Sequence, residues 1–196
     1  MTTVGNFTAG GEPMIWTYTN TLQGFYPDTV EYFASMATLF PFLALKFQKE
    51  MVEQSLLTLI IEKCIRFTDL DPSNTSEIRI ASITLLTEAW LTYSSFIDKN
   101  PNFVSSIQHV YKKNVRDRVR SVRLVTATQM FKLLDKFSAE KNSSAPFLYK
   151  TLIFSLVESP QDQSSRELFL TNFQYLFENT KSIPVGLLID PFVKSN

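Results

Sequence analysis

Residues 117–137, DRVRSVRLVTATQMFKLLDKF, carry the clearest structural signal in the chain. Within this stretch, apolar or small side chains recur at intervals of three or four residues: Val119, Val122, Thr126, Met130, Leu133 and Phe137. This spacing matches the 3.6-residue turn of an α-helix and places the six side chains on one face. Asp117, the first residue, is of a type that caps the exposed N–H groups of a first helical turn. The stretch therefore predicts a helix with one buried face.

Runs of the same design recur along the chain. Three others open with an acid or a serine: DTVEYFASMATLF from Asp28, SEIRIASITLLTEAWLTYSSF from Ser76 and SSRELFLTNFQYLF from Ser164. The four starts are 48, 41 and 47 residues apart, which is the period of repeats built from paired helices. Further apolar runs begin at a proline, a residue that fits the first helical turn: Pro13, Pro101, Pro146 and Pro184. The sequence predicts an all-α protein of about four antiparallel helix pairs plus a terminal helix.

An arginine marks the start of the second run in each of three pairs. Aligning the runs from Ser76 and Asp117 at an offset of 41 residues superposes Arg79 on Arg120, and Arg166 stands near the start of the fourth run. An acid or serine, then EIR or RVR, then an amphipathic helix resembles the HEAT and armadillo class of α-solenoids, over residues 13–193. The resemblance implies a superhelix of stacked helix pairs.

The same resemblance implies a structural ladder, because in that class the arginine often pairs with an acid in the turn within a repeat. Arg79, Arg120, Arg166 and Asp117 are the predicted ladder residues. Asp117 stands near Arg120 in the sequence. Arg79 would need Glu77 or Asp71 as its acid, and Arg166 would need Asp162.

The domain limits follow from composition and from the last residues. Of the 5 glycines, three precede residue 12, and we expect residues 1–12 to form a flexible segment. We expect residues 13–196 to form one helical repeat domain and a segment of a longer protein, because KSIPVGLLIDPFVKSN (181–196) starts like a helix pair and stops after one helix. Residues 103–137 contain no Pro or Gly. The predicted repeats require a turn near residues 114–117. The alternative is that residues 103–137 form a single long helix.

Catalytic and metal chemistry have few candidate residues. His109 is the single histidine and Cys64 the single cysteine, so one imidazole and one thiol would have to supply any triad or zinc site. DLDPSNTSEIRI (69–80) lacks the glycine and the final glutamate of a calcium loop. We predict no enzyme, no cofactor and no metal. One cysteine and the lack of an apolar leader predict a cytoplasmic protein without a membrane segment.

The charge of the chain is unevenly distributed. Residues 1–100 carry 6 Lys and Arg against 11 Asp and Glu, whereas residues 101–196 carry 13 against 8. KKNVRDRVRSVR (112–123) holds six basic residues and one acid. Such a cluster steers acidic partners, although a solvated helix face is the plainer reading.

We therefore predict a non-enzymatic scaffold that binds another protein with an acidic surface. Its predicted contact residues are Lys112, Lys113, Arg116, Arg118 and Arg123. Some HEAT-type modules bind tubulin through such turns, so the resemblance admits a cytoskeletal partner. Two alternatives stay open: a nucleic-acid-binding repeat, which zero net charge disfavours, and a regulatory segment of a larger enzyme. The sequence leaves open whether an exposed subset of four aromatic residues anchors a partner: Trp16, Tyr18, Trp90 and Tyr93. The oligomeric state is open as well.

Overall fold

The computed structural model describes residues 30–53, 55–69, 74–158 and 163–179. Over these residues the secondary structure is helical, and no strand occurs among them. The all-α prediction is thereby confirmed. Three predicted features lie outside the described residues. They are the flexible segment 1–12, the helix starts at Pro13 and Asp28, and the terminal helix from Pro184.

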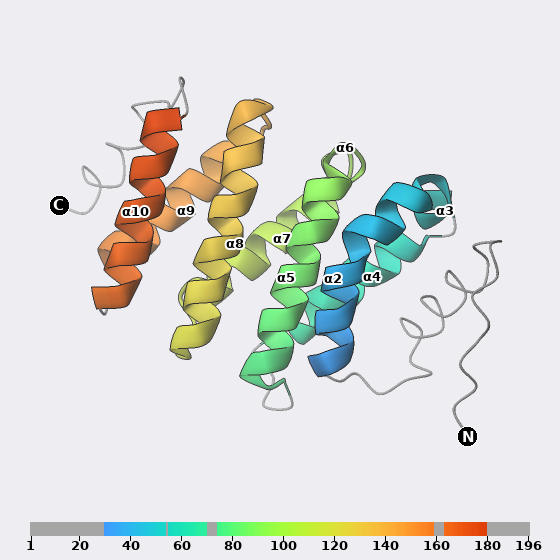
Figure 1. Ribbon diagram of the computed structural model, residues 1–196, viewed down its shortest axis with the longest axis horizontal. Coiled ribbons are helices and arrows are strands. Elements are labelled where there is room, and N and C mark those ends of the chain that lie inside the picture. The colour runs from blue at the N-terminus through green and yellow to red at the C-terminus, as the bar shows by residue number, and fades with distance from the viewer. Residues whose placement is uncertain (1–29, 54, 70–73, 159–162, 180–196) are drawn as a thin grey trace.

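The helices form two layers (Figure 1). Four long helices lie side by side in the first layer: α2 (Val30–Lys46), α5 (Ser76–Thr92), α8 (Arg120–Ala139) and α10 (Gln163–Asn179). The second layer lies behind and contains α4 (Leu56–Phe67), α7 (Pro101–Asn114) and α9 (Ala145–Glu158). The short helices α3 (Gln48–Glu53) and α6 (Ser94–Ile97) connect one pair to the next. Each first-layer helix packs on the next one along the chain.

The helices recur at nearly constant intervals. The first-layer helices begin at residues 30, 76, 120 and 163, which are 46, 44 and 43 residues apart. The second-layer helices begin at residues 56, 101 and 145, which are 45 and 44 residues apart. The structure is thus more regular than the 48, 41 and 47 residues that separate the predicted starts.

Local sequence explains where two of these helices begin. The side chain of Asn100 accepts hydrogen bonds from the N–H groups of Asn102 and Phe103, at 3.2 and 3.4 Å, and Pro101 follows at the first helical position of α7. In α5 the cap is Thr75, whose hydroxyl accepts from the N–H of Ile78 at 3.4 Å. The sequence predicted the cap at Ser76, and the structure places it one residue earlier, at Thr75.

The predicted turn between the two helices of the third pair is confirmed. Helix α7 ends at Asn114 and α8 begins at Arg120, so residues 103–137 are not one helix. Five members of the predicted stripe are fully buried: Val122, Thr126, Met130, Leu133 and Phe137. Val119 is 38% exposed, because it precedes α8 and belongs to the turn.

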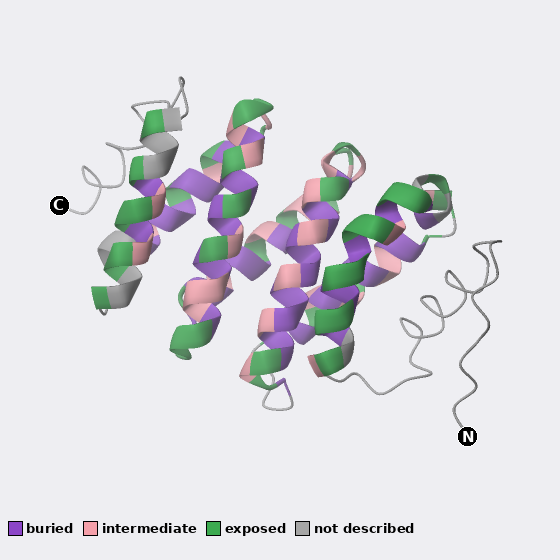
Figure 2. Cartoon of the chain, viewed as in Figure 1, coloured by how far each residue is buried: buried purple, intermediate pink, exposed green. Residues whose placement is uncertain are grey.

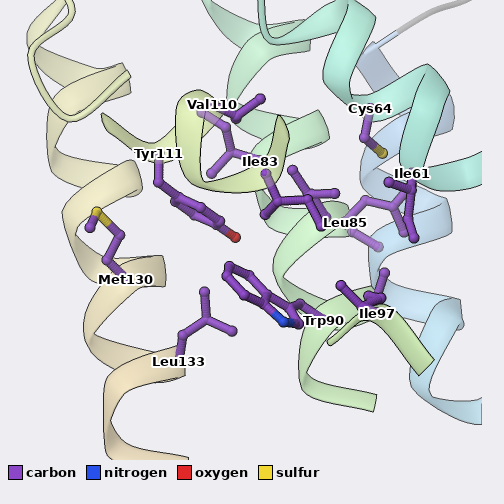
Figure 3. Close-up of a cluster of buried hydrophobic side chains, with 14 of the residues drawn as sticks. Ile61, Cys64, Ile83, Leu85, Trp90, Ile97, Val110, Tyr111, Met130 and Leu133 are labelled. Carbon is purple, nitrogen blue, oxygen red and sulfur yellow. The ribbon is translucent and has the colours of Figure 1, made fainter. Parts of the chain in front are cut away.

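The core is continuous between the layers, and α5 lies at its centre between α2 and α8 (Figure 2). Trp90 of α5 is fully buried and packs edge-on against Phe137 of α8, with ring centroids 5.3 Å apart. Tyr111 of α7 faces Trp90 across the layers (Figure 3) and shares a 2.6 Å hydrogen bond with the buried Thr87 hydroxyl. Burial raises the pKa of Tyr111. Trp90 and Tyr93 are core residues rather than exposed anchors.

Replacing Trp90 with alanine should lower the free energy of unfolding by about 3–5 kcal/mol, because it removes the ring that packs on Tyr111 of α7 and Phe137 of α8 and leaves a cavity there. Urea unfolding followed by circular dichroism measures this change. The matched control is Leu170→Ala on the exposed side of α10, which should change stability by less than about 0.5 kcal/mol. Equal losses in the two variants would contradict this packing.

Candidate partner-binding surface

A buried ion pair joins the α4–α5 turn region to the α7–α8 turn. Nη2 of Arg79, on the first turn of α5, lies 3.4 Å from Oδ1 of Asp117, and both side chains are buried. Nη1 of Arg79 donates to the carbonyl oxygen of Asn74 at 3.4 Å. One guanidinium therefore bonds its own turn and the turn of the following pair.

Two buried asparagines complete this junction. Nδ2 of Asn114, the last residue of α7, donates to the carbonyl oxygens of Val110 at 2.9 Å and Thr68 at 3.3 Å. Nδ2 of Asn74 donates to the carbonyl oxygens of Arg66 and Asp69, each at 3.2 Å. Three of the four acceptors, the carbonyl oxygens of Arg66, Thr68 and Asp69, lie at or just after the C-terminal end of α4, where carbonyl groups lack a partner within the helix.

Arg123 fixes the backbone of the α7–α8 turn. Its Nη1 donates to the carbonyl oxygen of Asp117 at 2.8 Å and to that of Arg118 at 3.0 Å. Oδ1 of Asp117 accepts from the N–H of Val119 at 2.8 Å. The turn is thus held at three backbone groups, the carbonyls of Asp117 and Arg118 and the N–H of Val119, and its conformation is set before any partner binds.

The five predicted contact residues divide into two groups. Lys112, Arg116 and Arg118 are exposed around the turn. Lys113 is half-buried and forms an ion pair with Asp69 of the preceding pair. Arg123 is half-buried and bonds the turn. The structure therefore brings three of the five to the surface and gives the other two internal contacts.

Arg120, which the sequence assigned to the ladder, is exposed at the first position of α8. The residue equivalent to Arg79 is Arg123, since each stands three positions after the start of its helix, as does Arg166 in α10. Each of the first two donates to the carbonyl oxygen five residues earlier. An alignment offset of 44 residues, instead of 41, superposes Arg79 on Arg123 and would have shown this equivalence.

The acid that pairs with Arg79 also differs from the prediction. The sequence offered Glu77 or Asp71, and the structure pairs Arg79 with Asp117, 38 residues later. Glu77 is exposed, and hydrogen bonds from its own backbone N–H and from Ser76 and Thr75 lower its pKa. Asp71 and Asp162 lie outside the described residues.

The exposed side chains at the α7–α8 turn are mainly basic. Lys112, Arg116, Arg118 and Arg120 are exposed, and Val119, which lies among them in the sequence, is 38% exposed. The acid in their midst, Asp117, is buried and directed toward Arg79, so its carboxylate does not project among them. We call these four cations with Val119 the basic turn.

The histidine and the cysteine, the candidates for catalysis or metal binding, lie on different helices. His109 is exposed on α7, and Cys64 is buried in α4, where burial raises the pKa of the thiol. Across the residues that the structure describes, no three His, Cys, Asp or Glu side chains gather into a potential metal site. None of the helices in that part of the chain combines the length and the apolar character needed to cross a membrane.

Comparison of the chain with models of protein families, with curated proteins and with solved structures gave no match.

Substituting one partner of the buried ion pair should destabilise the protein strongly. Asp117→Leu leaves the Arg79 guanidinium buried without its acid, and we expect a loss of about 3–5 kcal/mol in the free energy of unfolding. Arg79→Met with Asp117→Leu should cost less than the sum of the single variants, by about 1–3 kcal/mol. Urea unfolding of the four proteins in the cycle tests this coupling, and strictly additive losses would contradict it.

Proposed function

We propose that the chain is a non-enzymatic α-solenoid scaffold of the HEAT or armadillo type, and that its basic turn docks an acidic surface of another protein. Two observations support the first part: the two-layered order of the helices and their recurrence at 43 to 46 residues. Paired-helix repeats have this period, and each repeat buries its apolar face against its neighbours.

Contacts between equivalent positions of successive pairs support the same proposal. Three polar contacts join residues 44 positions apart: Lys113 with Asp69, Lys132 with Glu88, and Asn142 with Asp98. A fixed separation is expected when each pair is stacked on the preceding one with the same rotation.

A row of threonines follows the same register. The ninth residue of every first-layer helix is a threonine: Thr38, Thr84, Thr128 and Thr171. The first three donate from their hydroxyls to the carbonyl oxygen four residues earlier, at 3.1, 2.9 and 2.9 Å. The ninth position thus holds a threonine in all four helices, and in three of them its hydroxyl makes the same hydrogen bond.

The Arg79–Asp117 pair supports the resemblance to the HEAT class most directly. In that class an arginine near the start of the second helix pairs with an acid of a turn within a repeat. Here the arginine of one pair meets the acid of the next, and Arg123 takes the arginine position in the third pair. The ion pair between Arg79 and Asp117 is one rung of the proposed ladder.

The exposed cations of the basic turn carry the docking proposal. They project from a turn whose backbone is already fixed, so binding would order little besides the side chains, and preorganisation of this kind favours affinity. Val119 adds an apolar contact at the centre. Glu77, on the first turn of α5, is exposed. Its negative charge would repel a long phosphate backbone, which favours a protein partner over a nucleic acid.

Charge reversal of the basic turn should abolish the docking. Capture from a nuclease-treated lysate would compare the chain with an Arg116→Glu, Arg118→Glu, Arg120→Glu variant, and purified tubulin is a direct probe of the cytoskeletal alternative. The control variant is Lys99→Glu with Lys141→Glu. Both lysines are exposed. Lys141 follows α8, whose 20 residues extend about 30 Å from the basic turn, and Lys99 precedes α7, whose 14 residues span about 21 Å.

The proposal predicts that a discrete protein binds the chain and the control and is lost with the triple variant. All three proteins must first show the same melting temperature. Equal capture by the triple variant would place the binding surface elsewhere. The same capture is repeated with an untreated lysate. A protein that is captured from the untreated lysate and lost after nuclease treatment would favour nucleic acid as the ligand.

A further inference from the structure

The first helix of the first layer exposes large apolar side chains. Leu39, Phe42 and Leu45 of α2 are 53%, 71% and 86% exposed, and Figure 2 shows the exposed side of α2 along the outer surface of the layer. Three large apolar side chains exposed within seven residues form a cluster of the kind that marks interaction sites.

The sequence of α2 leaves this surface without charge. Residues 32–45 contain no Asp, Glu, Lys or Arg, whereas Glu31 and Lys46 flank them at the two ends of the helix. Both flanking residues are exposed. An uncharged apolar centre between an acid at one end and a base at the other is the pattern of a helix that can pair with an antiparallel copy of itself.

The exposed residues follow one face of α2. Glu31, Ser35, Thr38, Phe42 and Leu45 are exposed and separated by three or four residues. Such positions lie on one side of a helix. The buried residues, which lie on the opposite side and pack toward α5 and α4, are Phe33, Met36, Ala37, Phe40 and Ala44. The apolar face therefore points away from the core of its own chain.

We infer that this face of α2 binds the same face of a second copy of the chain, antiparallel and about a two-fold axis between Thr38 and Leu39. In this register Glu31 meets Lys46 of the second copy at both ends of the interface. Phe42 meets the small Ser35 of the second copy, so each large ring lies opposite a small side chain. Leu39 packs beside the axis against Thr38 of the second copy.

Charge and size complementarity favour a second copy over an unrelated partner. In a two-fold interface every contact occurs twice, and the same surface must complement itself. The α2 face meets this condition at its ends, where acid pairs with base, and at its centre, where large side chains meet small ones. The proposed dimer is independent of the basic turn.

Sedimentation equilibrium of the full chain tests the proposal. We expect a concentration-dependent dimer of twice the 22.5 kDa chain. Phe42→Asp should weaken dimerisation at least tenfold, because it buries a carboxylate in the apolar centre. Glu31→Lys and Lys46→Glu should each weaken it by placing like charges opposite each other, and the variant with both substitutions should regain the dimer.

Cysteine cross-linking tests the register independently. Thr38→Cys places a thiol beside the proposed axis. Thr128→Cys places one at the equivalent position of α8, which is also exposed. The native Cys64 is buried and does not compete. Under mild oxidation, Thr38→Cys should form a disulfide-linked dimer, and Thr128→Cys should form no disulfide between the two chains of its dimer.

Three outcomes would overturn the proposal. The first is a chain that sediments as a monomer at every concentration. The second is an equal rate of cross-linking for Thr38→Cys and Thr128→Cys. The third is a Phe42→Asp variant with a lowered melting temperature and an unchanged mass, which would mean that another segment of the same chain covers the face.

Discussion

The buried contact between Arg79 and Asp117 is the interaction on which the arrangement of the helix pairs depends. A guanidinium and a carboxylate both lose their hydration when buried, so each requires the other at hydrogen-bonding distance. Because the two residues belong to successive pairs, this requirement fixes the α7–α8 turn against the start of α5. Asn114 adds a second bond across the same junction, to the carbonyl oxygen of Thr68. Apolar packing brings the layers together, and these polar contacts select one register among those that packing alone would allow.

The same junction determines which charges reach the surface. Asp117 would neutralise its basic neighbours if it projected outward, but its carboxylate bonds Arg79 and the N–H of Val119. Arg123 turns back to bond two carbonyl groups of the turn. The remaining cations, among them Arg116, Arg118 and Arg120, are exposed on a fixed backbone. A structural ion pair and a proposed docking surface thus arise from the same short segment, in which adjacent residues point inward and outward.

The sequence predicted the helical class, the turn after Asn114 and an approximate period, because these depend on local spacing and on capping residues. It did not predict which acid pairs with Arg79, since the partner is 38 residues away and is brought near by packing between pairs. The alignment offset that assigned Arg120 to the ladder is three residues too short, and only the observed helix starts reveal the equivalence of Arg79 and Arg123. The exposed face of α2 was also missed. Its residues form an apolar run, and nothing local distinguishes a face that packs on α5 from one that does not.

Hydrogen–deuterium exchange of an Asp117→Asn variant tests most directly whether this junction couples successive pairs. The substitution keeps the size of the side chain and removes the charge that Arg79 requires. If the junction couples the pairs, amides of α5 and α8 should lose protection together, because the helix pairs open as one cooperative unit. If only the amides of residues 115–119 exchange faster, while α5 keeps the protection that it has in the unsubstituted protein, the ion pair is a local feature of the turn and does not hold the helix pairs in register.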